Sequence, residues 1–297
     1  MTGVLVAVLG VALVAVAELA RHDVLVYATG RDRPVGELPG GMPYAAGPGR
    51  TATASLVYLD GIGKMRFRDT RDGGRLVARI VADAPELRVL GHVLPYSPLA
   101  RPLAERRTAP WLRRHAALVL FLYNVAQILV AADARYRPLY NRAVGAEISE
   151  QLRRAGHPGD GRTPVVLLGY SGGAQIATGA VHEVATRLGA PVTVIGLGGF
   201  HSGANDLAAA TAFHELTSGH DAVERVGRWL FPLRWPVPGW GPWNRARRAG
   251  KVHVHRLDPA HHVGPSSYIS PTALLPDGRS HLQRTADVIV RIVRTGS

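Results

Sequence analysis

The chain has 297 residues, 46% of them hydrophobic, which suffices for one large domain with a substantial core. It contains no cysteine, so disulfides, thiolate metal sites and a cysteine nucleophile are excluded. The formal net charge of +13 comes almost entirely from arginines that are scattered along the chain without a nucleic-acid-binding motif. We therefore expect no nucleic-acid partner and a surface compatible with anionic lipid.

The first element in the chain is an apolar stretch at residues 2–20, in which Glu18 is the single charged residue. About 20 helical residues cross the hydrocarbon core of a membrane. No Lys or Arg precedes the stretch, unlike in a secretory signal peptide, and arginines follow it from Arg21 onward. We predict a membrane anchor helix at residues 1–20, with the body of the protein favoured on the cytoplasmic side. A buried N-terminal helix is the alternative.

After the anchor, a Gly/Pro-rich linker with a first short strand is expected at residues 21–50, and one folded domain at residues 51–297. A second apolar run at residues 116–132 carries Asn124 and Gln127 in its middle, where unsatisfied amides would be costly in lipid. The strands on either side of this run are expected in one sheet, which forbids a membrane crossing between them. We predict a core or cap helix there.

Strands and helices alternate through the domain. The near-continuous apolar run at residues 163–170 is typical of a parallel strand that is covered on both faces. The alternation predicts an α/β fold with a mostly parallel, doubly wound sheet. The strands are expected at residues 55–60, within 86–96, and at 163–170, 191–197, 211–217 and 251–257, and the helices at 140–154, 173–186 and 282–294.

The sharpest local signal is the sequence Gly-Tyr-Ser-Gly-Gly at residues 169–173, which matches G-x-S-x-G. An apolar strand runs directly into it and a helix of small residues leaves it. This context suits a serine that stands on a sharp strand-to-helix turn with its hydroxyl exposed, because flanking glycines let the strand and the helix approach closely. The motif predicts Ser171 as a nucleophile, against the alternative of a glycine-rich turn with an incidental serine.

From Ser55 to the C-terminus the sequence resembles the α/β-hydrolase fold family. In that family the serine is followed by an acid after a later strand and by a histidine after the last strand. Here the strand at 211–217 ends in Ser-Gly-His-Asp, and the strand at 251–257 leads to Asp-Pro-Ala-His-His-Val-Gly. The resemblance implies Asp221 as the acid and His262 as the base.

Each of these two assignments has rivals in the sequence. Asp206 follows the preceding strand and is the alternative acid. His261 is adjacent to His262, and His281 begins the final helix, so either histidine is an alternative base.

The resemblance also implies an oxyanion hole made of two backbone N–H groups. The first belongs to Gly172, directly after the nucleophile. The second is expected from the loop Asp-Gly-Ile-Gly at residues 60–63, with Ile62 as the first candidate and Gly61 as the next. Asp60 departs from the family pattern, in which histidine is common at that place.

A metal site is the other chemistry to weigh. His253 and His255 share one face of a strand, and His261 or Asp258 could join them, but no spaced motif such as H-E-x-x-H accompanies them. We expect neither a metal nor a cofactor.

A Trp/Pro-rich segment at residues 228–245 holds four of the five tryptophans, mixed with arginines. Such a mixture suits a membrane interface or an apolar acyl pocket, and a packed proline-rich loop is the alternative. Together with the resemblance, it predicts a serine hydrolase that acts on a hydrophobic or lipid-like acyl ester. A thioesterase, an acyltransferase or a non-catalytic membrane-associated scaffold are the alternatives, and the oligomeric state stays open.

Overall fold

The computed structural model describes residues 52–61, 71–91, 131–133, 135, 140–236 and 239–296. The predicted anchor helix at 1–20, the linker strand before residue 50 and most of the apolar run at 116–132 lie outside these residues. Among the helices of the described part, none is long and apolar enough to cross a membrane.

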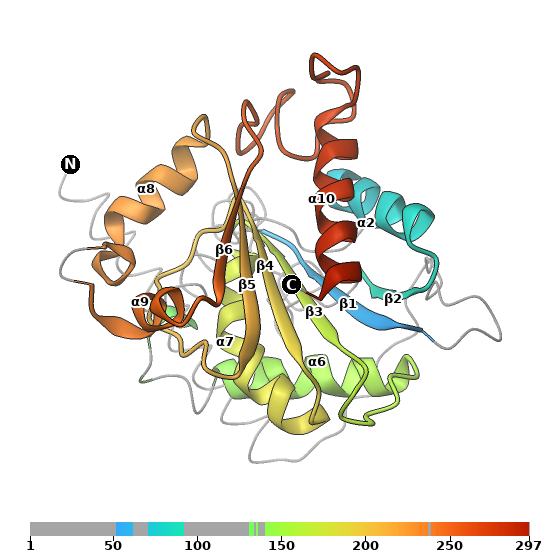
Figure 1. Ribbon diagram of the computed structural model, residues 1–297, viewed down its shortest axis with the longest axis vertical. Coiled ribbons are helices and arrows are strands. Elements are labelled where there is room, and N and C mark those ends of the chain that lie inside the picture. Colours follow the sequence, from blue (N-terminus) through green and yellow to red (C-terminus); the bar gives the residue numbers. More distant parts are fainter. Residues whose placement is uncertain are drawn as a thin grey trace, which may run out of the picture.

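The centre of the molecule is a six-stranded parallel sheet (Figure 1). Its order is β2-β1-β3-β4-β5-β6, and every neighbouring pair is parallel. This confirms the predicted α/β class and the parallel sheet. The strands are β1 (Ala54–Leu59), β2 (Leu87–Leu90), β3 (Val165–Tyr170), β4 (Val192–Leu197), β5 (Ala210–Thr217) and β6 (Val252–Arg256).

Helices cover both faces of the sheet, and alternate strand residues supply the two cores. On one face Val165 and Leu167 of β3 pack with α6 (Arg142–Arg154), α7 (Gly173–Leu188) and α9 (Gly241–Arg248). On the other face Val166 and Leu168 pack with α2 (Arg71–Asp83) and α10 (His281–Thr295), which lie side by side (Figure 1). The sheet is therefore doubly wound.

Two regions hold helices that the sequence patterns did not predict. Helix α2 follows β1, and the Trp/Pro-rich region contains the end of α8 (Ala222–Leu230), the short 3₁₀ helix η4 (Pro232–Arg234) and α9. The alternative of a packed proline-rich loop is wrong for the residues that form these helices. Pro232 and Pro242 lie at the beginning of η4 and of α9, where the missing backbone N–H has no helical acceptor to lose, and Pro236 lies between these two helices.

The parallel sheet brings residues that are distant in sequence together at the carboxyl ends of its strands. Because β3, β5 and β6 point the same way, the loops after their carboxyl ends lie at the same side of the sheet. These loops carry Ser171, Asp221 and His262.

The two-sided core makes a direct stability prediction. Leu167 in β3 is fully buried, so Leu167→Ala is expected to lower the free energy of unfolding by about 2–5 kcal/mol. Leu274 is 67% exposed, and Leu274→Ala is expected to change it by less than about 0.5 kcal/mol. Urea unfolding of the two variants checks this. Equal effects would contradict the described core.

Candidate active site

Ser171 stands on a strained turn between β3 and α7. Its φ angle is 53°, and it is the one non-glycine residue in the described part of the chain with a positive φ. Hydrogen bonds hold the turn: the Ser171 N–H donates to the Leu197 carbonyl at 3.0 Å, and the Ser171 carbonyl accepts from the Phe200 N–H at 3.0 Å. The end of β4 thus fixes the backbone of the serine in a conformation that a free chain rarely adopts.

The glycines of the motif are required by close backbone contacts. A Cβ on Gly169 would lie 2.5 Å from the Ala174 nitrogen, and a Cβ on Gly173 would collide with the Leu59 carbonyl oxygen. The glycines therefore let β3, α7 and the end of β1 approach around Ser171, as the sequence motif predicts.

The side chains of Ser171, His262 and Asp221 form one hydrogen-bonded chain. His262 Nε2 lies 2.8 Å from Ser171 Oγ, and His262 Nδ1 lies 2.8 Å from Asp221 Oδ2. Asp221 is fully buried and His262 is 8% exposed. The structure thus joins three side chains that are far apart in the sequence, in the order nucleophile candidate, imidazole and carboxylate.

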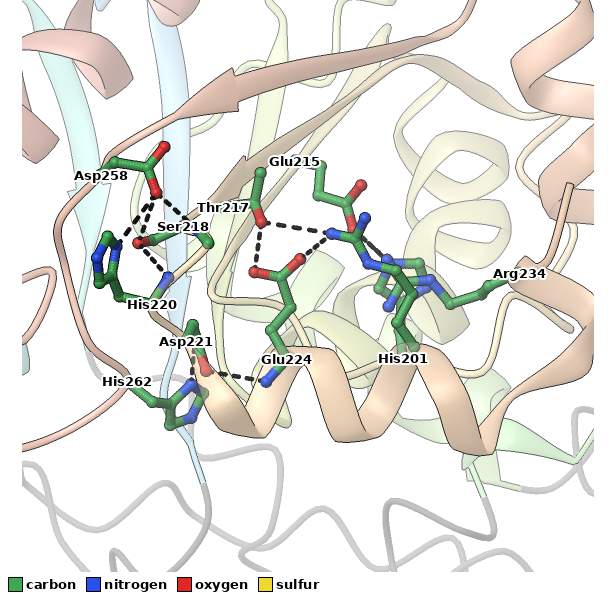
Figure 2. A network of polar contacts seen from close by, with 12 residues as sticks. His201, Glu215, Thr217, Ser218, His220, Asp221, Glu224, Arg234, Asp258 and His262 are labelled. Carbon is green, nitrogen blue, oxygen red and sulfur yellow. Dashed lines mark hydrogen bonds and ion pairs between the residues drawn. The ribbon is translucent and has the colours of Figure 1, made fainter.

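Asp221 is held by its own helix as well as by the imidazole (Figure 2). It is the N-cap of α8, where its Oδ1 accepts the Glu224 N–H at 2.9 Å and leaves Oδ2 for His262. Burial alone would raise the pKa of Asp221, but the hydrogen bonds from His262 and Glu224 hold it below its usual value. The carboxylate is therefore ionised at neutral pH and oriented along the imidazole.

Asp258 connects the loop of the acid to the loop of the histidine. It lies after β6, and its Oδ1 accepts the Gly219 N–H at 2.6 Å and the Ser218 hydroxyl at 3.1 Å (Figure 2). The backbone hydrogen bond from Gly219 is the main cause of its lowered pKa. A charged side chain in the segment before His262 therefore fixes the turn before Asp221.

Two tyrosines around the imidazole were not identified from the sequence. The Tyr170 ring stacks on His262 with centroids 5.6 Å apart, and its hydroxyl donates to the His262 carbonyl. Tyr268 is fully buried beside Asp221, and burial, then the Asp221 charge, raises its pKa, so it stays neutral. Tyr170 occupies the variable position of G-x-S-x-G, and this position beside the serine is the signal that could have found it.

The alternative acid and bases lie in other surroundings. Asp206 is half-buried and accepts the Ala208 N–H at 2.9 Å in a local turn. The His261 ring lies 5.8 Å from that of His220, and His281 Nδ1 lies 3.1 Å from the Ser267 carbonyl. In the described part of the chain, His262 is the histidine that hydrogen-bonds Ser171.

The expected oxyanion donors are described in part. Gly172 is the N-cap of α7. Among the turn and loop hydrogen bonds of the described residues, none is donated by the Gly172 N–H. The loop after β1 contacts the serine, since a Cβ on Gly61 would lie 3.6 Å from Ser171 Oγ. The Gly61 N–H, however, donates to Asp60 Oδ1 at 2.7 Å, so it is already engaged. Ile62 lies outside the described residues.

A buried ionic cluster lies between β5 and η4, on the far side of Glu224 from Asp221 (Figure 2). Glu215 forms an ion pair with Arg234, and His201 Nε2 lies 3.9 Å from Glu215 Oε1. Burial opposes the charge of Glu215, but His201 and Arg234 lower its pKa to about 2. Burial and the nearby Arg234 lower the pKa of His201 to about 4. At neutral pH the pair is therefore charged and the histidine neutral, and this pair anchors η4 to the sheet.

His253 and His255 of β6 lie beside His214 of the neighbouring strand β5. His214 Nδ1 lies 3.0 Å from His255 Nε2, and the rings of His214 and His253 stack at 4.9 Å. Burial, then the charges of His255 and His253, lower the pKa of His214 to about 4. Among the described residues no group of three or more His, Asp or Glu could hold a metal ion.

The depressed pKa of Asp221 predicts a pH-dependent stability. A carboxylate whose folded pKa lies below its unfolded pKa stabilises the fold above the unfolded value, about 3.9, and this contribution is lost as the pH falls through the folded pKa. Asp221→Asn keeps a good N-cap but loses the charged bond to His262. We expect it to lower stability at pH 7 by about 1–3 kcal/mol.

Urea unfolding of wild type and Asp221→Asn as a function of pH checks this prediction. The difference between them is expected to shrink below about pH 4, where the carboxyl of the unfolded chain begins to be protonated while the native carboxyl is still charged, and to vanish below the native pKa. Asp206→Asn, which changes a half-buried carboxyl without an imidazole partner among the described residues, is the control. A difference that stays constant down to acidic pH would contradict the described charge of Asp221.

No family model and no curated protein matches the chain. Among solved structures it is similar to the crystal structure of DphMB1, with a TM-score of 0.40 and 14% sequence identity over 84% of this chain and 79% of that chain. A similarity at this level leaves the function of the chain open.

Proposed function

We propose that this protein is a serine hydrolase of the α/β-hydrolase type, with Ser171 as nucleophile, His262 as general base and Asp221 as its orienting acid. The observation that carries the proposal is the hydrogen-bonded chain of these side chains, with 2.8 Å at each of its two contacts. The positive φ of Ser171 supports it, because such a turn exposes the hydroxyl at the end of a strand. The strand order and the chain order serine, acid, histidine fit this fold type.

The proposed reaction proceeds by acyl transfer. His262 Nε2 takes the Ser171 proton as Oγ attacks the ester carbonyl, and the Gly172 N–H at the N-terminus of α7 stabilises the resulting oxyanion. The C–O bond to the alcohol breaks, and the imidazolium gives its proton to the leaving oxygen. Water then attacks the acyl-enzyme, again with His262 as base, and releases the acid and free Ser171. Asp221 holds the imidazole tautomer and stabilises its charge.

The substrate class that we propose is a hydrophobic or lipid-like acyl ester, met at a membrane. Two observations support it. The sequence at residues 2–20 is long and apolar enough for a membrane anchor. Trp229 and Trp240 are 72% and 71% exposed, as in proteins whose tryptophans contact an interface.

Labelling with a fluorescent fluorophosphonate tests the nucleophile. The detergent-solubilised wild type is expected to label, because an activated serine attacks the electrophilic phosphorus. Ser171→Ala is expected to abolish labelling, and His262→Ala to slow it by about a thousandfold or more. In-gel fluorescence over time measures the rates.

The adjacent histidine supplies a matched control. His261→Ala is expected to label within about twofold of the wild-type rate, since a surface substitution away from the reacting atoms has small effects. A well-folded wild type that does not label, or a Ser171→Ala variant that still does, would overturn the proposed mechanism.

A series of p-nitrophenyl esters tests the substrate class. If the acyl site is apolar, kcat/KM rises with acyl length, since each buried CH₂ contributes about 0.8 kcal/mol, roughly fourfold per methylene. Spectrophotometric rates for acetate through octanoate measure this. A maximum at acetate would contradict a hydrophobic acyl site and leave the nucleophile assignment standing.

A further inference from the structure

Helix α8 exposes its large apolar side chains and buries a glutamate. A surface helix of a soluble protein normally turns its apolar stripe toward the core. In α8 the buried residues are Glu224 and Gly227, whereas Val226, Trp229 and Leu230 are 53%, 72% and 50% exposed. This arrangement needs an explanation other than packing within the described part of the chain.

The orientation of α8 is fixed by the candidate active site. Its N-cap is Asp221, and its first turn directs Glu224 inward, where the carboxylate accepts the Thr217 hydroxyl at 2.6 Å and pairs with Arg228 (Figure 2). Burial raises the pKa of Glu224, so this position is costly for a charge and is held by specific partners. The helix therefore cannot turn its apolar side inward without breaking the contacts around Asp221.

The exposed apolar side chains of α8 and of the residues that follow it are here called the α8 face. Val223, Val226 and Leu230 are spaced i, i+3 and i+7 and so share one side of the helix. Seven of the ten large hydrophobic side chains that are exposed in the described part of the chain belong to this short region. They are Val223, Val226, Trp229, Leu230, Leu233, Trp235 and Trp240.

Arginines border the α8 face. A hollow of about 350 Å³ opens between α8 and the edge strand β6, and Trp229 and Trp235 line it together with Arg225, Arg228 and Arg256. Arg225 makes no ion pair with any described residue, so its charge is available to a partner. The surface thus combines indole rings, aliphatic side chains and cationic groups at its border.

This combination selects one class of partner. A second copy of the chain would bring another net charge of +13 against the arginines, which opposes association. The apolar residues 2–20 contain a single acidic group, Glu18, and could not match several arginines. A bilayer with anionic headgroups offers both an apolar layer for tryptophan and negative charge for arginine.

We propose that the α8 face docks the protein onto an anionic membrane surface, with Trp229 and Trp240 inserted among the headgroups and the arginines on lipid phosphates. This adds a second membrane contact to the anchor proposed for residues 1–20. It is independent of that anchor and of the chemistry of Ser171. Since α8 begins at Asp221, docking would set the candidate active site at a fixed orientation to the lipid.

Site-directed spin labelling tests the proposal directly, because the chain has no native cysteine. Single cysteines replace Trp229 or Trp240 in the full-length Ser171→Ala protein, which cannot hydrolyse the lipid by the proposed mechanism. Leu274→Cys is the matched control, since Leu274 is 67% exposed in the segment before α10, away from α8. Each labelled protein is measured free in detergent, with phosphatidylcholine vesicles, and with vesicles that also contain phosphatidylglycerol.

With the anionic vesicles, the collision rate with a water-soluble nickel complex is expected to fall about threefold or more at 229 and 240, as for side chains that are buried roughly 5–10 Å into the headgroup region. The label at 274 should stay accessible. Molar salt, or Arg225→Glu, should reverse much of the protection, because headgroup attraction is screened or lost.

Three outcomes would overturn the proposal. Labels at 229 and 240 that stay as accessible as that at 274 would show that the anchor alone holds the protein. Protection that is already complete without lipid, accompanied by spin–spin broadening that disappears on dilution with unlabelled protein, would indicate a second copy as the occupant. Equal protection by neutral and anionic vesicles would remove the role of the arginines.

Discussion

The backbone at Ser171 adopts a left-handed conformation that costs a non-glycine residue about 1–3 kcal/mol. The end of β4 stabilises it, because Leu197 and Phe200 hydrogen-bond the serine backbone on both sides. Glycines at 169 and 173 allow the strand and the helix to come close enough for these bonds to form. The hydroxyl is thereby held in one place, and the other parts of the site are arranged to meet it.

The loops that meet Ser171 are each held by the same kind of hydrogen bond. Each is tied by a carboxylate to a backbone N–H: Asp60 to Gly61 after β1, Asp258 to Gly219 before the acid, and Asp221 to Glu224 at the start of α8. Charged acceptors make stronger hydrogen bonds than neutral ones. The protein therefore uses three acidic side chains to fix loop backbones around one imidazole.

Helix α8 exposes apolar side chains that its sequence would be expected to bury. A short helix that reads as amphipathic is expected to bury Val226, Trp229 and Leu230, yet it exposes them. The constraint comes from its first turn, where Asp221 and Glu224 must face inward. Local demands of the candidate site thus set the orientation of α8 and leave an apolar surface whose partner has to be found outside the described residues.

The parallel sheet and the place of Ser171 could be predicted because their signals are local. The strand at 163–170 is apolar throughout, and G-x-S-x-G specifies a turn by the absence of Cβ atoms. The partners of the serine required the chain order of a family, and the adjacent His261 stayed an alternative to His262 until the loop after β6 had its three-dimensional course. Tyr268, Asp258 and the Glu215–Arg234 pair were not foreseen, because each is defined by contacts between elements that are distant in sequence. Helices α8 and α9 were not predicted because prolines, tryptophans and arginines obscure the helical period there.

The account as a whole depends on whether Ser171 becomes acylated. Rapid acid quenching of the full-length protein with p-nitrophenyl butyrate, followed by peptide mass mapping, measures this directly. The account predicts a transient butyryl group on the peptide that contains Ser171, which forms before the steady state and is absent when Asp221 is replaced by Asn or His262 by Ala on the same time scale. Turnover of the ester with an acyl group on a different residue, or with none at Ser171, would contradict it.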